Sequence, residues 1–431
     1  MRRSTVRLAL LVLLPFGAVS LPSAARAQTG SNSLSLSTIY RRIDAGTPRI
    51  VAANAAARAA EARIAPSRRP PDPMLQFALM NRRLPGLGLD DVLGMNQIQL
   101  VQMIPVAGKL GLAAGVERAR TSAANDRAAE VRLEERERAA MAFFELYEAD
   151  RSLEVAQEAR GLLRDLVRTT STMYAVGEGS QPDVLRAQVE LARMSEDLVR
   201  MSAMRVSASA RLNAVLDSSP EAALGTPVLP VYPASLPSRD SLQRLALAHR
   251  PMLAAGAANV HAAEVSERLA GREIWPDLEV GIQYGWRPME GGTDRMASLM
   301  LGVRLPIWAG SRQWAMRRET RAMRDMAAAD LAGMAADTRG RVAELDADAR
   351  RARDLLQLYR TTVLPQADAT VASALAAYRV GGVDFMTLLD ARMDLTRYRQ
   401  ETIRLEAELG RSLASLEMLT GADLMGDGGS P

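Results

Sequence analysis

The chain has 431 residues, 48% of them hydrophobic, which is enough apolar material for a sizeable core. Aromatic residues make up only 4%, and the dominance of Ala, Leu, Arg and Glu is typical of long helices. The net charge of +4 comes from four arginines within the first 27 residues, and 54 minus these 4 leaves 50 Lys and Arg against 50 Asp and Glu. This neutral remainder argues against nucleic-acid binding through overall positive charge, so we expect no nucleic-acid partner.

Residues 1–27 have the pattern of a secretory signal peptide. The basic start MRRSTVR precedes the apolar run LALLVLLPFGAVSL, and Ala25-Arg26-Ala27 offers small residues for cleavage before Gln28. The alternative is that the apolar run is retained as a membrane anchor. The sequence contains no cysteine, which excludes disulfides, thiolate metal sites and the acylated cysteine of a lipoprotein. Any membrane attachment of the mature chain then has to come from its folded surface.

Two copies of one unit make up the mature chain. Pro73-Met74-Leu75 corresponds to Pro276-Asp277-Leu278 at an offset of 203, and Ile104-Pro105 corresponds to Leu305-Pro306 at an offset of 201. Residues 173–191 align with residues 377–395 at an offset of 204. We therefore assign a first repeat to residues 28–224, a Pro-rich linker to 225–238, a second repeat to 239–421 and a disordered tail to 422–431.

Each copy is expected to have the order helix, strand, strand, helix. A first helix (about 36–66 and about 240–270) precedes two strands, at about 73–82 and 96–106 in the first copy and about 276–287 and 297–307 in the second. Residues 108–173 and 310–364 contain no proline, so they predict helices of roughly 80–100 Å that pack side by side in an elongated bundle.

A coiled-coil seam follows in each copy. Apolar residues recur there at spacings of three and four, which is typical of helices packed along one face. The first copy has Leu191, Met194, Leu198, Met201, Leu212 and Val215, opposite Leu395, Tyr398, Thr402, Leu405, Leu416 and Leu419 in the second.

The strands alternate between apolar and polar positions. In the second copy Leu278, Val280, Ile282, Tyr284 and Trp286 alternate with Glu279, Gly281, Gln283 and Gly285, and the first copy shows a weaker version. This pattern suits tilted transmembrane β-strands, although an ordinary half-buried hairpin pair has it too. Four strands cannot close a barrel, and an open edge in lipid leaves backbone groups unpaired at several kcal/mol each. Either the sheet lies outside a membrane or several chains share one barrel.

At this point the sequence resembles a known family, the TolC-like outer-membrane efflux proteins. The resemblance lies in the junctions IPVAGK (104–109) and LPIWAGS (305–311) and in the turns YAVGEGSQPDVLRAQVEL and YRVGGVDFMTLLDA, and it covers essentially the whole mature chain. The junction IPVAGK is most similar to the metal-efflux branch. The junction residues Pro105, Gly108, Pro306 and Gly310 mark, by this resemblance, where the chain leaves the outer membrane and starts a periplasmic helix.

The resemblance implies a mainly α fold with a small β part. Three chains would each give four strands to a shared twelve-stranded transmembrane β-barrel, and their helices would form a long α-helical barrel across the periplasm. The implied function is the passive exit duct of a tripartite efflux system for drugs or metal ions in the outer membrane of a Gram-negative bacterium. The implied partners are two further copies, outer-membrane lipid, a periplasmic adaptor (membrane fusion) protein and an RND-type or ABC-type inner-membrane pump.

The helix turns carry the candidate site residues. By the resemblance, Val176, Gly177, Gly179, Val380, Gly381 and Gly382 form the tips that contact the adaptor. Asp390 matches a position that is often an inward acidic residue at the periplasmic mouth, where a ring of three carboxylates would favour cations. Thr387 stands where some members carry a second acid, and the first repeat has Asp183 and Arg186 at the corresponding positions. An Arg186–Asp390 link could hold the mouth shut, and the alternative is that these are solvated surface charges.

No residue set points to catalysis, so we expect a protein that is not an enzyme and needs no cofactor. The two histidines, His249 and His261, have no partner at ligand spacing, and we expect no metal site. The 22 methionines are scattered along the sequence or lie on helical seams, where Met is a common filler. The alternatives to an efflux duct are a periplasmic coiled-coil scaffold, a pump adaptor protein, and an outer-membrane channel of type I secretion.

Overall fold

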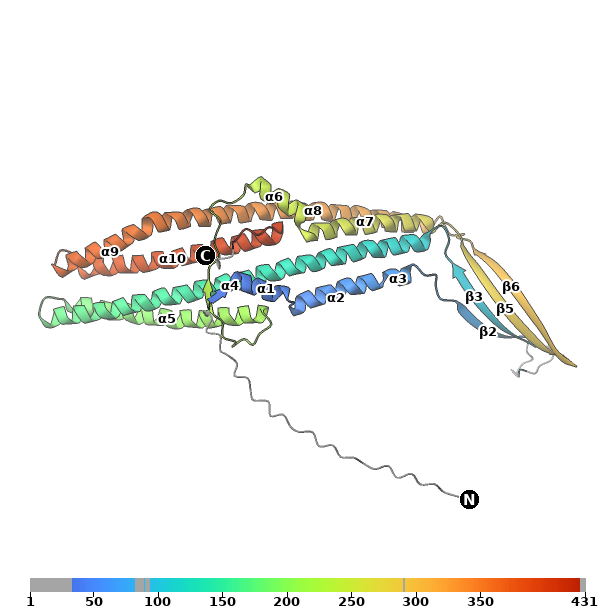
Figure 1. Ribbon diagram of the computed structural model, residues 1–431, viewed down its shortest axis with the longest axis horizontal. Helices are drawn as coiled ribbons and strands as arrows, with labels where there is room; N and C mark the ends of the chain where they lie inside the picture. Colours follow the sequence, from blue (N-terminus) through green and yellow to red (C-terminus); the bar gives the residue numbers. More distant parts are fainter. Residues whose placement is uncertain (1–32, 82–88, 90–93, 290, 427–431) are drawn as a thin grey trace, which may run out of the picture. The chain divides into compact units, whose positions relative to one another are not determined.

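The computed structural model describes residues 33–81, 89, 94–289 and 291–426. The predicted signal peptide and residues 427–431 of the predicted tail lie outside these residues. The described part is mainly helical, and a four-stranded sheet follows the ends of several long helices (Figure 1). Within this described part, no helix combines the length and the apolar character needed to cross a membrane.

The first helix predicted in each copy is broken. After β1 (Ser33–Ser35), residues 36–66 form α1 (Leu36–Asp44), α2 (Pro48–Ala62) and the start of α3 (Ile64–Ser67). Gly46, at φ 118°, ends the first of these, and Pro48 starts the next. In the second copy, Arg250 divides α6 (Arg239–His249) from α7 (Pro251–Arg272), because a residue that precedes proline avoids the helical conformation.

The sheet joins the two copies. Its strands β2 (Met74–Met80), β3 (Met95–Ile104), β5 (Asp277–Met289) and β6 (Gly292–Arg304) are antiparallel and lie in the order β2-β3-β5-β6. The pair β3–β5 connects the first repeat to the second. The second hairpin is longer than predicted, since β5 continues to Met289 and β6 begins at Gly292 instead of about 297, with Gly291 and Gly292 at positive φ between them. The outer edges of β2 and β6 have no partner strand among the described residues.

Long helices follow each pair of strands. The 67-residue α4 (Lys109–Ala175) is about 100 Å long, and α5 (Gln181–Val215) returns beside it. In the second copy α8 (Gln313–Leu358), the π-helix η1 (Tyr359–Val363) and α9 (Leu364–Arg379) run on as one helix past Pro365. The wider turns of η1 directly precede this proline, which has no N–H to donate to the preceding turn. The chain then returns along α10 (Phe385–Thr420).

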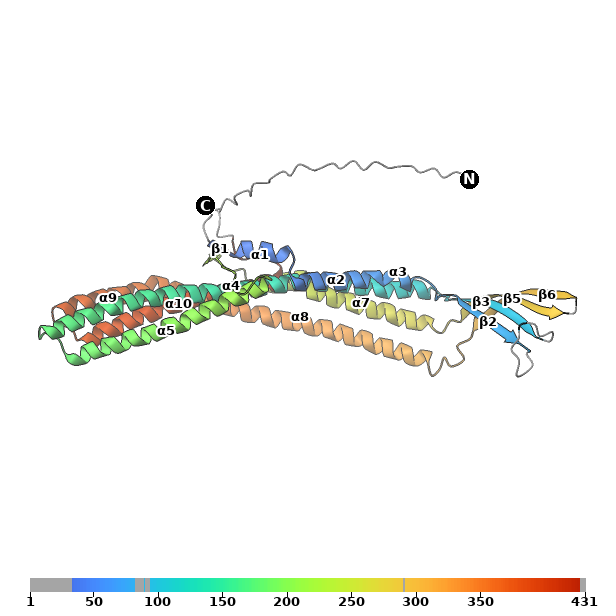
Figure 2. The ribbon, with the colours of Figure 1, turned by 90° about the horizontal axis from the view of Figure 1, so that it is seen from below.

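The helices of the two repeats pack against each other through α4, which lies against both α7 and α10 of the second repeat (Figure 2). Most of the predicted seam is buried, with Leu212, Leu405 and Leu416 fully enclosed, while Leu191, Met201 and Tyr398 are half-buried. Gly410 leaves room for the Phe144 ring, which occupies the place where a Cβ would lie. Across the same interface, Tyr147 Oη donates to Glu406 Oε2 at 2.5 Å, and Arg411 Nη1 donates to Glu148 Oε2 at 2.9 Å.

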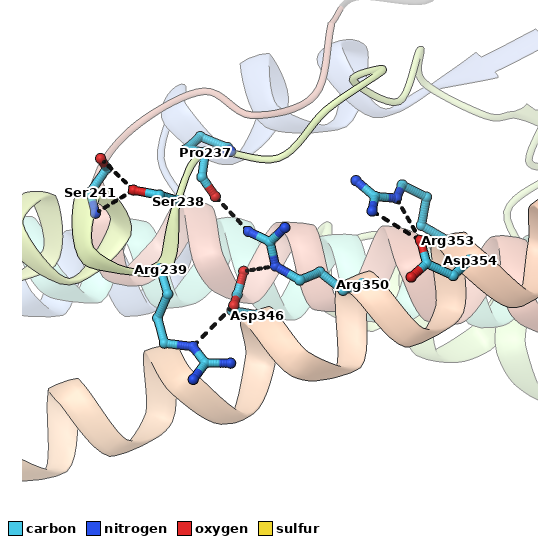
Figure 3. A network of polar contacts seen from close by, with 8 residues as sticks. All are labelled: Pro237, Ser238, Arg239, Ser241, Asp346, Arg350, Arg353 and Asp354. Atoms are coloured by element: carbon cyan, nitrogen blue, oxygen red, sulfur yellow. Dashed lines mark hydrogen bonds and ion pairs between the residues drawn. The ribbon is translucent and has the colours of Figure 1, made fainter.

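The Pro-rich segment 225–238 is held to the helices at both of its ends. Its β4 (Thr226–Val228) pairs in parallel with β1. At the other end, the buried Asp346 of α8 accepts from Arg239 Nε at 3.2 Å and Arg350 Nε at 2.8 Å, and Arg350 also donates to Pro237 O at 2.7 Å (Figure 3). Because a buried carboxylate needs partners, this network fixes where the second repeat begins.

The predicted disordered tail is wrong for residues 422–426. Glu417 Oε1 accepts from Leu424 N at 2.7 Å and from Met425 N at 2.8 Å. Val231 and Gly426 form a backbone bridge between this segment and the Pro-rich segment. This order could not be predicted from the segment itself, because its polar and Gly-rich composition does not reveal a buried acceptor for its backbone N–H groups.

Candidate functional site

The two helix turns are built alike. Gly177, at φ 78°, and Gly381, at φ 73°, adopt the left-handed conformation just after α4 and α9. Their N–H groups donate to the carbonyls of Tyr174 and Tyr378, each at 3.1 Å. Such a left-handed residue ends a helix and turns the chain, and glycine adopts it without a Cβ penalty.

The other predicted tip residues lie on the same two turns. A Cβ at Gly179 would lie 3.0 Å from the backbone N of Tyr174, so that turn is too close to its helix for any other residue without a shift. Gly382 is less tight, with Ala377 O at 3.4 Å from an added Cβ. Val176 and Val380 are 65% and 83% exposed. Both turns thus offer backbone and small apolar side chains to a partner.

The predicted gate residues occupy the first turns of α5 and α10. Asp384 caps α10, and its Oδ1 accepts from Thr387 N at 2.9 Å and from Thr387 Oγ1 at 2.5 Å. These hydrogen bonds, aided by the charge of Arg186, lower the pKa of Asp384. Thr387 is therefore engaged in capping the helix. Asp384 was not singled out from the sequence, although Asp three residues before Thr is a recognisable cap pattern.

Arg186 and Asp390 are not joined within the chain. Both side chains are exposed, and no ion pair within 4.0 Å connects them in the described structure. The charge of Arg186 helps to lower the pKa of Asp384. Burial raises the pKa of Tyr378, and the charge of Asp183 raises it further. The charged residues at the start of α5 therefore lie close enough to the second turn to shift pKa values there. The Asp390 carboxylate is exposed to solvent.

The first junction contains a buried cation that sequence reasoning missed. Lys109, which directly follows Gly108 (φ 74°), donates through Nζ to Asp277 Oδ1 at 2.8 Å and to Trp275 O at 3.0 Å. Glu273 Oε2 lies 3.6 Å from the same nitrogen. These contacts tie the start of α4 to the start of β5. Lys109 was part of the quoted motif, but its partners Trp275 and Asp277 are 166 and 168 residues away in the sequence, and only the fold brings them together.

The second junction has no equivalent lysine. Residues 305–311 hold Pro306 and Gly310 in the predicted order, and Ser311 takes the place that Lys109 has in the first copy. Leu305, Ile307 and Trp308 are 65%, 76% and 70% exposed. This junction presents its apolar side chains outward.

The sheet has one apolar face that is open to the surroundings. The registers place apolar residues of neighbouring strands side by side, as in the row Leu75, Leu100, Ile282 and Leu299. Leu75, Ile282 and Leu299 are 69%, 60% and 70% exposed. Asn96 and Gln102 of β3 and Arg295 of β6 lie on the same face, which is otherwise mostly apolar. A largely apolar face of this kind on four strands is an interaction surface for lipid or protein.

The opposite face carries polar and small residues. Gln76, Gln99, Gln283 and Ser298 form one row across all four strands, and Gln283 Nε2 donates to Gln97 Oε1 at 2.5 Å. Gly281 and Gly285 on this face are buried under methionine side chains of the neighbouring strands. The two faces of the sheet therefore suit two different environments.

All four tryptophans lie near the ends of the strands. Trp275 precedes β5, and Trp308 and Trp314 follow β6. Trp286 lies toward the other end of β5, with its ring centroid 6.2 Å from that of Phe77 and 6.0 Å from that of Tyr284. Aromatic residues at both ends of apolar strands are typical of membrane–water interfaces.

The described residues contain no group of three or more His, Cys, Asp and Glu that could hold a metal ion. His261 lies in the middle of α7, with Glu264 as an exposed neighbour at 3.5 Å.

These features define a class of fold, two tandem helix-strand-strand-helix units with long antiparallel helices, that solved outer-membrane channels share. The outer-membrane channel OprN is 20% identical over 90% of this chain and 89% of that chain, with a TM-score of 0.76. VceC from Vibrio cholerae is 16% identical over 90% and 96%, with a TM-score of 0.75. CmeC from Campylobacter jejuni is 13% identical over 97% and 95%, with a TM-score of 0.76. At these identities the likeness shows the fold alone.

One part of the sequence matches a known family. Residues 242–422, the second repeat, match the model of the outer membrane efflux protein family. No curated protein sequence matches the chain. The predicted resemblance to the TolC-like outer-membrane efflux proteins is confirmed, and the mainly helical fold is the one expected from it. This family consists of channels and not of enzymes.

Proposed function

We propose that three copies of this chain form the passive outer-membrane exit duct of a tripartite efflux system. The four-stranded sheets would close into one twelve-stranded barrel in the outer membrane of a Gram-negative bacterium, and the helices would line a duct through the periplasm. An inner-membrane pump and a periplasmic adaptor would deliver the solute.

The observation that carries this proposal is the open sheet. One face exposes Leu75, Ile282 and Leu299, and the edges of β2 and β6 are unpaired in the described chain. An apolar sheet that enters lipid has to pair both of its edges, because backbone groups have no water to bond there. Copies of the same chain satisfy this need if β6 of one pairs with β2 of the next.

The aromatic residues support the membrane location of the sheet. Trp275 and Trp286 are separated by 286 minus 275, or 11, positions, which is about 36 Å of extended chain at about 3.3 Å per residue. A tilt of about 45° reduces this to about 25 Å along the membrane normal, close to the height of the apolar band of outer-membrane barrels.

The internal repeat predicts the register between chains. Within the chain, Ile104 pairs with Leu278 across β3 and β5. In the repeat, Ile104 corresponds to Leu305 and Leu75 corresponds to Leu278. The same pairing between chains places Leu305 opposite Leu75 of the next chain, and therefore Val303 opposite Phe77. All of these residues lie on the apolar face, so the derived register keeps that face continuous.

Disulfide trapping tests this register in a chain that has no cysteine of its own. The double variant Val303→Cys/Phe77→Cys should give covalent dimers and trimers on oxidation in outer membranes, because opposed strand positions bring the Cα atoms within disulfide reach. Val303→Cys/Leu75→Cys, displaced by two residues, and Val303→Cys/Gln76→Cys, on opposite faces, are the controls and should cross-link far less.

Native mass after detergent extraction separates the two ways in which this test can fail. A trimer that cross-links only in a control variant would overturn the register and leave the duct intact. A monomer recovered from the soluble periplasm would overturn the shared barrel and favour a periplasmic scaffold.

The helix turns would form the periplasmic mouth, with the tip residues meeting the adaptor and Asp390 facing the opening. The exposed Asp390 has no ion-pair partner within its own described chain, which leaves its charge free to act on passing ions. In planar bilayers, Asp390→Asn should lower the permeability ratio of cations to anions. Asp394→Asn, which removes a carboxylate one turn away that pairs with Arg397, is the control. An equal change in both variants would refute the role of Asp390.

A further inference from the structure

A cavity between the two helical hairpins is not accounted for by the proposed duct. It has a volume of about 200 Å³ and lies between α4 of the first repeat and α9 and α10 of the second. Its walls are mainly aliphatic and include Leu162, Leu163, Leu166, Leu375, Leu388 and Met393. A concave, apolar lining of this kind favours a ligand with an apolar part.

Two arginines border this apolar cavity. Arg379 and Arg392 both line it, and Arg392 is half-buried. Among the described residues, neither guanidinium has an ion pair within 4.0 Å or a hydrogen bond. Burial, with a smaller effect from the charge of Arg399, lowers the pKa of Arg392. A partly desolvated cation without a partner is unfavourable, so Arg392 is poised to receive an anion.

The nearby carboxylates already have partners. Asp165 is the acidic side chain of the described lining, and its Oδ1 lies 3.7 Å from Arg168 Nη1. Asp368, whose charge partly opposes the lowering of the Arg392 pKa, has its Oδ1 3.3 Å from Arg399 Nη2. The lining therefore holds two arginines against one aspartate that has its own counter-charge. This excess of positive charge favours an anion from outside the chain.

Helix packing alone does not account for the two arginines. In the repeat, Arg379 and Arg392 correspond at the offset of 204 to Ala175 and Gln188. Both copies form the same glycine turn followed by a long helix, so the first copy shows that this structure forms without arginine at these positions. The positive charge is therefore a feature of the cavity and not of the repeat.

We infer that this cavity binds an alkyl carboxylate, with the apolar tail among the leucines and the carboxylate on Arg392. A planar guanidinium holds both oxygens of a carboxylate, and the exposed Arg379 adds a second positive charge at the rim. The cavity suits a tail of about six carbon atoms, because a methylene takes up about the volume of one water, roughly 30 Å³. The site lies within one chain, so it goes beyond the proposed duct and does not depend on it. A bound anion would hold α4 of the first repeat to α9 and α10 of the second.

A single cysteine at the cavity tests this site, because the chain has none of its own. Thr169 is exposed and lines the cavity, whereas the exposed Thr172 lies nearly one turn further along α4 and does not line it. Both hydroxyls donate in the same way, to the carbonyls of Asp165 and Arg168. In the purified full chain in neutral detergent, hexanoate should slow maleimide labelling of Thr169→Cys at least about fivefold relative to chloride, because a bound ligand covers the thiol. Labelling of Thr172→Cys should not change.

The guanidinium and the negative charge are tested separately. Added to Thr169→Cys, Arg392→Gln should raise the hexanoate concentration for half protection at least about tenfold, since it removes the charged partner of the carboxylate. Arg397→Gln, which removes an arginine that pairs with Asp394 outside the cavity, should leave protection unchanged. 1-Hexanol, with the same tail and no charge, should protect far more weakly. Arg392 has no partner to lose, so Arg392→Gln should fold as the wild type does, and circular dichroism checks this.

Three results would overturn the site. The first is labelling of Thr169→Cys that hexanoate does not slow, or that is absent without ligand because another copy of the chain covers the cavity. The second is equal protection by hexanol and hexanoate, and the third is unchanged protection in Arg392→Gln; either would leave an apolar cavity that selects no anion. Native mass of the same samples tests the duct independently, since monomers that show selective protection would refute the duct and support the site.

Discussion

The Glu417 side chain holds the segment 422–426 in place, although the composition of that segment does not predict an ordered conformation. Its carboxylate accepts the backbone N–H groups of Leu424 and Met425. Burial is the larger effect on its acidity and raises the pKa of Glu417 to about 7, with a further increase from Asp423, while the backbone hydrogen bonds act in the opposite direction. The folded chain therefore takes up a proton at this residue more readily than the unfolded chain does.

This raised pKa predicts a direction for stability against pH. The contribution of Glu417 is fully present below the ordinary carboxyl pKa and is lost as the pH rises through about 7. The loss amounts to at most about 3 kcal/mol. Thermal unfolding in detergent at pH 4.5 to 8 should show this decline in the wild type and a flatter profile in Glu417→Gln, whose amide does not titrate. Identical profiles in the two proteins would contradict the role of Glu417.

Gly410 sets the distance between α4 and α10. Gly410→Ala adds a methyl group at the place that the Phe144 ring occupies. The resulting overpacking should destabilise the fold by about 1–3 kcal/mol. Gly161→Ala is the matched control, since an added Cβ there meets nothing within 4 Å and alanine favours a helix by about 1 kcal/mol. Urea unfolding followed by circular dichroism compares the two, and a neutral Gly410→Ala would show that the helices adjust freely.

At the scale of elements, the two strand-to-helix junctions differ although their sequences repeat. The first is tied to β5 by Lys109, whose side chain is 7% exposed, while the second has Ser311 instead. The tie lies inside one chain. If three chains share a barrel, the equivalent position at each boundary between chains lacks it, so the boundaries depend on strand pairing and apolar contacts.

Removal of this lysine should loosen the attachment of the sheet to the helices. Lys109→Met leaves Asp277 without its cation and should cost about 3–5 kcal/mol, the range for one partner lost from a buried pair. Arg120→Met, which breaks an exposed pair with Glu117, should cost about 0–1 kcal/mol. Urea unfolding measures both. Addition of Asp277→Asn to Lys109→Met should restore part of the loss, and a purely additive double variant would refute the pairing.

At the scale of the whole molecule, the duplication is consistent with the proposed trimer, in which one chain would supply a third of a closed structure. Each copy brings two strands and one long helical hairpin, and the contacts between copies within a chain use β3 with β5 and α4 with both α7 and α10. In the repeat, β2 corresponds to β5 and β6 corresponds to β3. The free edges of β6 and β2 therefore match the edges that β3 and β5 use to pair within the chain. A chain built this way can continue its own internal pattern with further copies until the ring closes.

The membrane location can be measured through tryptophan fluorescence. In bilayers of brominated lipid, a variant that keeps only Trp308, which is 70% exposed, should be strongly quenched. The control is a variant whose single tryptophan is introduced by Val176→Trp at the first helix turn, which should retain its fluorescence. Equal quenching, or none in either variant, would contradict a sheet in the membrane with turns away from it.

Several features of this protein follow from the sequence by itself, because they depend on local or periodic patterns. The offsets near 203 reveal the repeat, the lack of proline from 108 to 173 predicts α4, and the alternation from Leu278 to Trp286 predicts a two-faced strand. The turns at Gly177 and Gly381 were recognisable as well, since a left-handed residue after a long helix strongly favours glycine.

Other features were decided only by the tertiary structure, because they depend on partners that are distant in the sequence. Lys109 meets Asp277, Glu417 binds the backbone of the chain after Thr420, and Met95 covers Gly285 only once the distant segments have packed together. The predicted tail failed for the same reason. A pattern within one segment reports what that segment can form, and its buried contacts depend on which other segments the fold places beside it.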